Sequence, residues 1–248
     1  MSSSPRAFAE DPHAYLPPPA GAKVIDDPRF FLSMSADGAH AAVCRVRTTD
    51  VTAVFSEARA AAPLARIVWT FGDASLEPAL RALGCRDQDP PLTSYVTALA
   101  STSEPPAVDG VEVRRVASYE DFLVGLEVSA AGWQTPVTEE PRSIWERRAS
   151  RPGGEWIAYL DEEPVAYAGA IAGPAGLFLT GGVTRPEARG RGAYRALVRA
   201  RWDEAVRRST PALVVHAEEA SRRVLESIGF ERVCDIVDLV SDPPESRS

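Results

Sequence analysis

The sequence comprises 248 residues, of which 45% are hydrophobic and 25% charged, with a formal net charge of −8. These values predict a globular protein of one large domain or two small ones. The acidic balance disfavours general nucleic-acid binding, which needs a basic surface. No apolar run approaches the roughly 20 residues of a membrane span. The first residues lack the apolar stretch of a secretory signal, so we expect a cytoplasmic protein.

The first part of the chain predicts a flexible arm and then a small β-α-β-α-β unit. Residues 1–22 are rich in Pro, Ser and Ala, which is typical of a loosely ordered segment. Residues 23–103 form the expected unit, and the Ser- and Pro-rich residues 101–106 indicate a linker at its end. The strand patterns are 41–46, 65–71 and 93–99, and the helix patterns are 50–61 and 75–83.

Residues 107–240 predict a second and more complete α/β unit, followed by a polar tail at 241–248. Apolar and polar residues alternate as in strands, or recur as on one face of a helix. The strand patterns are 111–116, 156–160, 165–171, 177–183, 212–216 and 231–240, and the helix patterns are 119–129, 139–149, 193–208 and 219–227. The predicted fold class is therefore α/β, with a mixed and mostly antiparallel sheet flanked by helices.

The two predicted units share a weak internal repeat. Residues 67–85 and 213–230 both read as a strand, a helix, and a glycine between two hydrophobic residues. Such endings are common, so chance is an alternative explanation, and duplication of the fold is the functional interpretation. Duplication would make the first unit a copy that has lost its motif.

The three cysteines give no sign of a disulfide framework or a metal site. Cys44, Cys85 and Cys234 are far apart, and none belongs to a CxxC pair. Each lies in an apolar stretch, where a cysteine usually packs as a small buried side chain.

Residues 181–194 carry the most informative motif, because glycines and arginines gather between an apolar strand and a long helix. Glycines at such a turn let backbone N–H groups converge on one point. The start of the helix adds unpaired N–H groups and the positive end of its dipole. Together these features predict a cradle for a diphosphate, and Arg189 and Arg191 bring positive charge to it. The other arginines up to Arg208 are interpreted in part as a solvated helix face, although Arg195 could also reach a phosphate.

Two other phosphate-binding loops do not fit this segment. A Walker loop needs Gly-Lys-Ser/Thr, which is absent from the sequence. A dinucleotide fingerprint needs a third glycine where the chain has Arg195. It also needs a parallel βαβ opening, whereas the strand before this loop follows a hairpin.

The run Arg189-Gly190-Arg191-Gly192-Ala193 resembles the Arg/Gln-x-x-Gly-x-Gly/Ala motif of the GNAT acetyltransferase superfamily, from which Tyr194 departs at the last position. The element order from 111 to 240 and the helix-Gly-Phe ending at Phe230 match that family as well. The resemblance implies the acyl-CoA N-acyltransferase fold, with a truncated GNAT-like copy in the first unit. It implies acetyl-CoA as the cofactor and no metal. The positions implied to contact acetyl-CoA are Val183, Arg189, Gly190, Arg191, Gly192, Ala193, Tyr194 and Ser221.

The resemblance also implies direct acyl transfer to a primary amine. Strands 177–183 and 212–216 would splay around the pantetheine, and a bulge near Gly182 and Val183 would aim an N–H at the thioester carbonyl. Other members often carry a tyrosine where this chain has Leu225, and an asparagine where it has Glu218. The remaining candidates for an acid–base role are His216 and Glu218. The alternatives are structural: His216 could be a histidine with satisfied hydrogen bonds at the end of a strand, and Glu218 an acid that stabilises the start of a helix.

The acceptor is expected to be a primary amine of a small molecule or a protein N-terminus, bound by a monomer or a homodimer. In the family, the loop that holds Trp133 and Gln134 here borders the acceptor pocket, and an aromatic anchor for the loop is the structural alternative. We expect neither nucleic acid nor membrane as a partner. The rival class is an acyl-CoA-binding sensor without turnover, which the missing tyrosine would suit.

Overall fold

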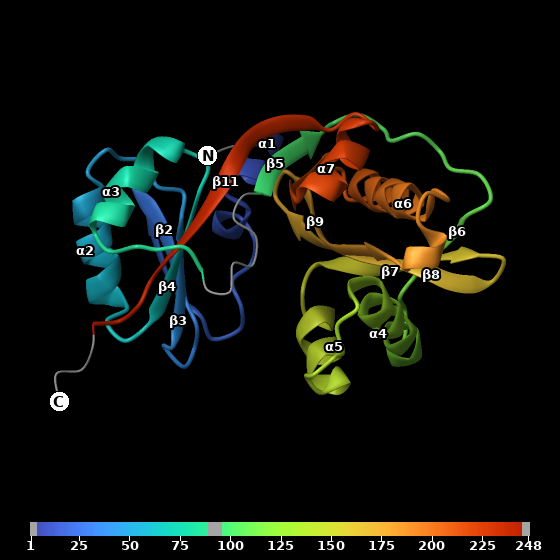
Figure 1. Ribbon diagram of the computed structural model, residues 1–248, viewed down its shortest axis with the longest axis horizontal. Helices are drawn as coiled ribbons and strands as arrows, with labels where there is room; N and C mark the ends of the chain where they lie inside the picture. Colours follow the sequence, from blue (N-terminus) through green and yellow to red (C-terminus); the bar gives the residue numbers. More distant parts are fainter. Residues whose placement is uncertain (1–3, 89–95, 245–248) are drawn as a thin grey trace. The chain divides into compact units, whose positions relative to one another are not determined.

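The computed structural model describes residues 4–88 and 96–244, and the chain divides into two compact units that interleave along the sequence (Figure 1). Each unit is described by itself. The main segments of unit 1 are Ala100–Val215 and Arg223–Glu231, and those of unit 2 are Arg6–Leu99, His216–Arg222 and residues 232–244.

Unit 1 is a mixed sheet with helices on both faces. Its elements are β6 (Glu112–Arg115), α4 (Tyr119–Trp133), α5 (Pro141–Ala149), β7 (Gly153–Leu160), β8 (Glu163–Gly173), β9 (Gly176–Thr184), the 3-10 turn η3 (Pro186–Ala188), α6 (Ala193–Arg207) and most of β10 (Leu213–Ala217). Strands β6 to β9 pair antiparallel in sequence order, whereas β9 and β10 are parallel. Helices α4 and α5 lie on one side of these strands and α6 on the other (Figure 1).

Local sequence explains where the two long helices of unit 1 begin and which side chains they bury. Helix α4 starts with a capping box, in which Ser118 and Asp121 satisfy each other's backbone N–H groups. Helix α6 buries Leu197, Val198 and Trp202, as its amphipathic pattern predicts. Val206, by contrast, is exposed despite its place in that pattern.

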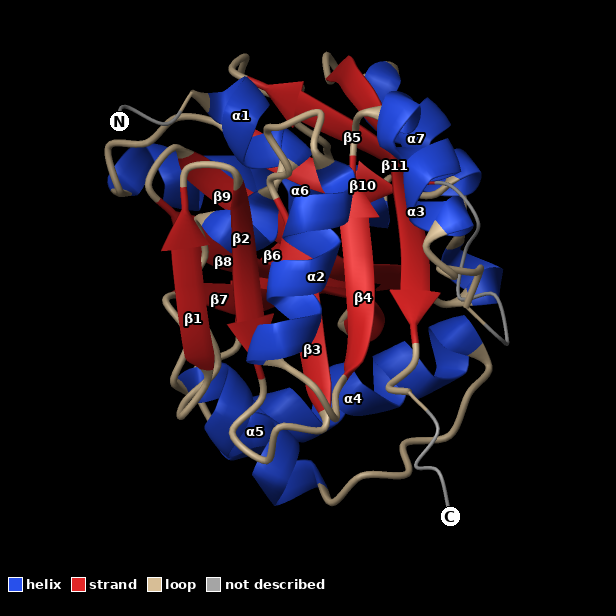
Figure 2. Ribbon diagram, turned by 90° about the vertical axis from the view of Figure 1, so that its left-hand side faces the viewer, coloured by secondary structure: helices blue, strands red, loops and turns tan. Residues whose placement is uncertain are grey.

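Unit 2 is built mainly from the first part of the chain. Its elements are α1 (Pro5–Glu10), η1 (Pro12–Ala14), β1 (Lys23–Asp27), β2 (Phe30–Met34), β3 (His40–Cys44), α2 (Val51–Ala61), β4 (Arg66–Phe71), η2 (Ala74–Leu76), α3 (Glu77–Ala82) and nearly all of β11 (Glu231–Ser241). Strand β5 (Val96–Ser101) and helix α7 (Glu219–Glu226) contribute residues to both units. Strands β1, β2 and β3 are antiparallel, β3 and β4 parallel, and β4 and β11 antiparallel. Figure 2 shows α2 crossing in front of β2, β3 and β4.

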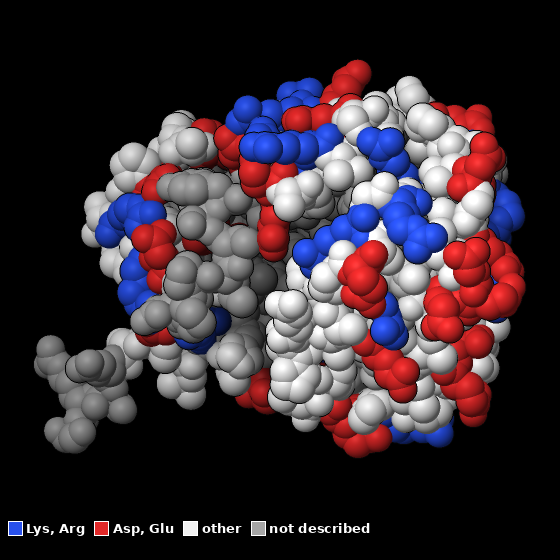
Figure 3. All heavy atoms as spheres, turned by 45° about the vertical axis from the view of Figure 1, so that its right-hand side comes forward, with Lys and Arg blue, Asp and Glu red and all other residues white. Residues whose placement is uncertain are grey.

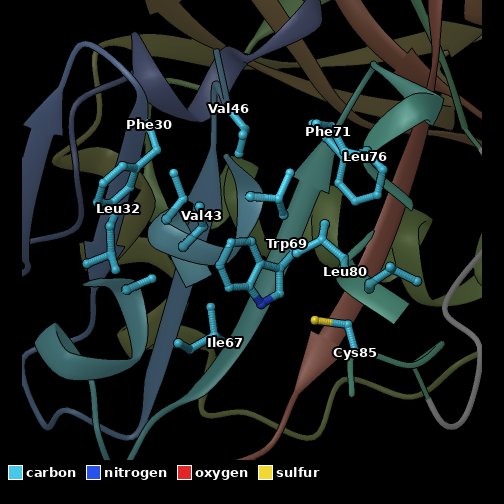
Figure 4. Close-up of a cluster of buried hydrophobic side chains, with 14 of the residues drawn as sticks. Phe30, Leu32, Val43, Val46, Ile67, Trp69, Phe71, Leu76, Leu80 and Cys85 are labelled. Atoms are coloured by element: carbon cyan, nitrogen blue, oxygen red, sulfur yellow. The ribbon is translucent and has the colours of Figure 1, made fainter. Parts of the chain in front are cut away.

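The core of unit 2 forms where α2 and α3 pack on this sheet. Trp69 lies at its centre among aliphatic side chains of neighbouring strands (Figure 4). Its ring stacks on Phe55 of α2 with 5.4 Å between centroids, and its indole N–H donates to Ser241 Oγ at 3.0 Å. A buried indole usually finds such a partner, because an unpaired N–H in a core is costly.

The structure corrects several expectations for unit 2. Residues 5–14 form α1 and η1 with Phe8 fully buried, although their composition predicts a loose arm. Strands β1 and β2 are additional to the prediction. The sequence also places residues 231–240 with the second unit, but β11 pairs antiparallel with β4. Ser241, predicted to begin a polar tail, is the buried end of that strand. The strand expected at 93–99 lies partly outside the described residues and otherwise corresponds to β5.

The cysteines pack largely as predicted. Cys44 and Cys85 are buried, and Cys234 is half-buried. Burial raises the pKa of both Cys85 and Cys234 to about 11, which keeps these thiols protonated at neutral pH. The described residues contain no group of three potential His, Cys, Asp or Glu metal ligands. None of the helices in residues 4–88 and 96–244 is long and apolar enough to cross a bilayer.

Candidate cofactor-binding site

Strand β9 carries a bulge at two consecutive glycines. Val183 pairs with Tyr167 and Thr180 with Gly169, so Gly181 and Gly182 together face a single residue of β8. A bulge of this kind leaves an extra residue outside the hydrogen-bond ladder. The bulge lies where the family resemblance predicts it, next to Val183.

Beyond its antiparallel neighbour, β9 pairs only briefly with β10. In the described chain their register comprises two pairs, Leu213 with Leu177 and Val214 with Phe178. Strand β9 continues for six more residues, to Thr184. Its bulged half therefore has no parallel partner in the register, as expected for a splayed strand pair.

The turn after β9 leads into a helix whose first amides have no side-chain cap. Gly192 is the N-cap residue of α6, with φ 89° and ψ −9°, and no side chain bonds the helix start. The other helices of nine or more described residues, α2, α4 and α5, each begin with a side-chain oxygen that accepts a backbone N–H. A Cβ added at Gly190 would meet no atom within 4 Å. The start of α6 thus has no side-chain cap and carries the positive end of the helix dipole, while the Val108 side chain lies against Gly192.

Three arginines surround this turn, and each already has a partner within unit 1. Arg189 donates from Nη2 to Gly132 O at 3.2 Å and from Nε to Thr184 O at 3.4 Å. Arg191 lies 3.5 Å from the exposed carboxylate of Asp161. Arg195 donates to Ser227 Oγ at 3.1 Å. Exposed pairs such as that of Arg191 are weak, so its guanidinium can exchange partners.

Acidic groups limit the extent of positive charge on the surface. On the face drawn in Figure 3, basic side chains are interspersed with acidic ones. Basic groups therefore do not form one broad surface on that face.

Half-buried Tyr194 and fully buried Arg201 lie on α6 next to the strands that form the bulge. The Tyr194 ring lies against Gly182, where an added Cβ would come within 2.7 Å of ring atom Cε2. Arg201 is 1% exposed and donates to Leu197 O at 2.9 Å and to Gly169 O at 3.2 Å. Burial lowers the pKa of Arg201 to about 10, partly offset by Tyr194, so the guanidinium stays charged at neutral pH. Burial also raises the pKa of Tyr194.

The end of α4 borders the bulge from the other side of the sheet. A Cβ added at Gly132 would overlap Val183 Cγ2, so the backbone of the last helical turn lies directly on Val183. The next residue, Trp133, is 52% exposed. Gln134 ends the helix in the left-handed conformation, with φ 54° and ψ 36°. The two residues predicted to contact the acceptor thus follow a turn that is packed against the bulged strand.

The predicted site residues fall into two groups. Val183 and residues 189–194, together with Trp133 and Gln134, all belong to unit 1. His216, Glu218 and Ser221 belong to unit 2, where Ser221 Oγ donates to Glu218 O at 3.0 Å. Their roles stay predictions.

The environment of His216 restricts the chemistry that its imidazole can perform. Its Nε2 lies 2.9 Å from Ala9 O. Because a carbonyl only accepts, Nε2 must carry the proton of this bond. Burial lowers the pKa of His216 to about 4, so the ring is neutral at pH 7 and weakly basic. Glu218 is exposed.

Sequence reasoning missed two residues of this region. Arg201 was grouped with the arginines of a solvated helix face, although it is buried. Its position on the apolar stripe beside Trp202 was the available signal. Gly132 gave no signal of its own, because its tight contact with Val183 depends on the packing of α4 on β9.

Comparison with known proteins agrees with this geometry. Residues 123–230 match the model of the acetyltransferase (GNAT) family. The chain therefore carries a GNAT-family domain over these residues. No curated protein sequence matches the chain.

Solved structures share the fold over most of the chain. A GCN5-related N-acetyltransferase from Kribbella flavida has a TM-score of 0.64 and 16% identity, over 91% of each chain. A tandem GNAT protein from the clavulanic acid biosynthesis pathway has a TM-score of 0.60 and 16% identity, over 92% of this chain and 85% of that one. A GCN5-related N-acetyltransferase from Sphaerobacter thermophilus has a TM-score of 0.60 and 14% identity, over 88% and 82%. At these identities the likeness establishes the fold and not the reaction.

Proposed function

We propose that this protein is an acyl-CoA-dependent N-acyltransferase that moves an acetyl group from acetyl-CoA to a primary amine of a small molecule or a protein N-terminus. The observation that carries the proposal is the uncapped N-terminus of α6, which follows the bulged strand β9 through a turn with open space at Gly190. An uncapped helix start of this kind is a ready site for a diphosphate.

The residues of the turn fit coenzyme A in shape and charge. Backbone N–H groups of residues 190–194 would bind the diphosphate, helped by Arg191, whose surface partner is easily displaced. The open space at Gly190 leaves room for phosphate oxygens to approach the backbone. Acetyl-CoA would supply an acyl group activated as a thioester.

The bulged half of β9 would bind the rest of the cofactor. Since its register with β10 ends at Phe178, the backbone from residue 179 onward can bind pantetheine amides in place of a neighbouring strand. A free N–H of the bulge, next to Val183, would donate to the thioester carbonyl and stabilise the negative charge that develops there.

The acceptor amine must lose a proton before it attacks. A lysine-like ammonium has a pKa near 10.4, about three units above neutral pH, so a base or a water relay is required. His216 and Glu218 remain our candidates. His216 is a weak base, because burial lowers its pKa to about 4 and its Nε2 proton is donated to Ala9 O. No covalent intermediate is included, because the site offers no activated nucleophile.

A sensor that binds acyl-CoA without turnover is the second candidate. Leu225 occupies the position of the family's usual tyrosine, and its side chain is fully buried and cannot donate a proton. Loss of that donor would slow departure of the thiolate more than it would weaken cofactor binding.

Calorimetry and turnover assays test both candidates. Titration of the full chain with CoA and with acetyl-CoA should give saturable one-to-one binding. Incubation with acetyl-CoA and a panel of amines and N-terminal peptides should then release CoA thiol with at least one acceptor. Binding without release for any acceptor favours the sensor. Absence of CoA and acetyl-CoA binding overturns both functions.

A further inference from the structure

We propose that Arg189 is a positioning residue, whose side chain fastens the end of α4 and the adjacent Trp133 loop (residues 133–137) to the cofactor turn, instead of binding phosphate. Its catalytic consequence rests on the proposed acyltransferase function, but the attachment itself does not.

The attachment consists of two hydrogen bonds from one guanidinium. Arg189 donates from Nη2 to the carbonyl of Gly132, at the end of α4, and from Nε to the carbonyl of Thr184, at the end of β9. Both acceptors are backbone atoms of segments that are distant in sequence. The planar fork of an arginine can bridge two such carbonyls at once, which a lysine ammonium does less well.

The end of α4 favours a cation at this position. The last carbonyls of a helix lack partners within the helix and lie at the negative end of its dipole. Ala130 O is satisfied by Thr135 N at 3.1 Å, and Trp133 O by Thr135 Oγ1 at 3.2 Å. Arg189 supplies a partner for Gly132 O.

Packing holds the same turn against the bulge. Because glycine at 132 lets the helix backbone lie on Val183, the end of α4 and the bulged strand are in direct contact. The Arg189 bonds flank this contact at the neighbouring residue Thr184. Packing fixes the distance between α4 and β9, and the guanidinium fixes the direction in which the chain leaves the helix.

The loop held in this way presents apolar surface. Trp133 and Val137 are among the few large hydrophobic side chains that are exposed in the described chain. In the proposed enzyme this surface binds the body of the acceptor beside the thioester. Release of Arg189 would leave cofactor binding largely intact but would broaden the orientations of the loop, which weakens acceptor binding.

Hydrogen–deuterium exchange on the free protein tests the attachment without any ligand. Arg189→Met should raise deuterium uptake of a peptide spanning 131–137 several-fold, and Arg189→Lys should raise it less. Arg191→Met, which removes an exposed arginine two residues away, is the matched control and should leave that peptide unchanged. Uptake in Arg189→Met equal to that of the wild type overturns the proposal, whether or not CoA binds.

Binding and kinetic measurements test the consequence. In Arg189→Met the Kd for CoA should stay within about threefold of the wild-type value, and the KM of whichever amine is turned over should rise at least about tenfold with little change in kcat. A tenfold or greater loss of CoA affinity together with an unchanged 131–137 peptide would identify a phosphate ligand instead. If the wild type binds no CoA, the proposed function fails, while the exchange result still decides the attachment.

Discussion

Units 1 and 2 contain the same strand–turn–helix–strand arrangement, but only in unit 1 do the two parallel strands separate along most of their length. In unit 1, β9 leads through a glycine-rich turn to α6 and then to the parallel strand β10. In unit 2, β3 leads to α2 and then to the parallel strand β4. The five-residue β3 pairs with β4 at four positions, whereas the nine-residue β9 pairs with β10 at two. The splay therefore distinguishes the units, and the topology does not.

The turns between strand and helix also differ, because in unit 2 the side chains of Asp11 and Asp50 accept hydrogen bonds from the backbone N–H groups near the turn. Asp50 caps α2 by accepting from Ala53 N at 3.0 Å. Asp11, which is buried, accepts from Arg45 N at 2.8 Å and pairs with Arg47. In unit 1 the corresponding helix start has glycines and no side-chain cap. The comparison teaches that a shared fold supports an anion site only where its own side chains leave the amides free.

The largest expected effect comes from placing a carboxylate in the open turn. Gly190→Asp should weaken CoA binding at least about 100-fold, because negative charge would lie where we propose that the diphosphate binds, whereas Gly190→Asn should cost far less. Calorimetry measures both. Gly190 suits the test better than Gly192, where an added Cβ would come within 2.8 Å of Val108 Cγ1.

Gly38→Asp is the matched control for this variant, since Gly38 also has a positive φ and open space around it, but belongs to a turn of unit 2. Equal losses for Gly190→Asp and Gly190→Asn would show that shape, and not charge, governs the turn.

Removing the Asp11 carboxylate from the turn of unit 2 should destabilise the protein without creating a second CoA-binding site. Asp11→Ala removes a buried acceptor from Arg45 N and leaves Arg47 without that partner, at a cost of about 3 kcal/mol. Chemical denaturation measures the loss, with Asp37→Ala in an exposed turn as the control. A second CoA-binding event in Asp11→Ala would contradict this expectation, because the Asp50 cap and the four-position pairing of β3 with β4 remain in the variant.

The acid limb of the stability curve should depend on His216 of unit 2. The folded pKa of about 4 lies below the ordinary value of 6.5, so the unfolded chain takes up a proton that the folded chain resists. Stability is therefore fully present above pH 6.5 and falls as the pH drops toward 4, by on the order of 2–3 kcal/mol.

Urea denaturation at a series of pH values measures this slope. His216→Gln can still donate to Ala9 O but cannot titrate, so its stability should change less between pH 6.5 and 4. An identical pH dependence in the variant would place the acid sensitivity elsewhere.

The smallest effect is expected at the cap of α2. Asp50→Ala should lower stability by about 1 kcal/mol, the usual value of an N-cap side chain. Thermal denaturation would detect it, and Asp50→Asn, which keeps an acceptor, should recover most of the loss. A cost near zero would mean that α2 tolerates the same uncapped start as α6, which would weaken the contrast between the units.

Local patterns predicted the fold and the glycine-rich turn before α6, whereas contacts between distant segments were not predictable. The bulge, the splay and the start of α6 follow from glycines at a strand-to-helix turn and from a known family motif. The pairing of β11 with β4 could not be predicted from local sequence, since either edge suits an alternating strand. The bonds of Arg189 to Gly132 and Thr184 were equally inaccessible, because a guanidinium beside a phosphate-binding motif looks like a ligand until the backbone carbonyls around it are placed.

The partner of β4 also bears on how the protein is made. The two strands are made at different times, because all of β6 to β10 is synthesised after β4 and before β11. While the chain is emerging from the ribosome, the edge of β4 that pairs with β11 therefore has no partner until residues 231–241 arrive. Unpaired strand edges promote aggregation, so the nascent chain is most prone to aggregate late in synthesis, after the glycine-rich turn before α6 has been made.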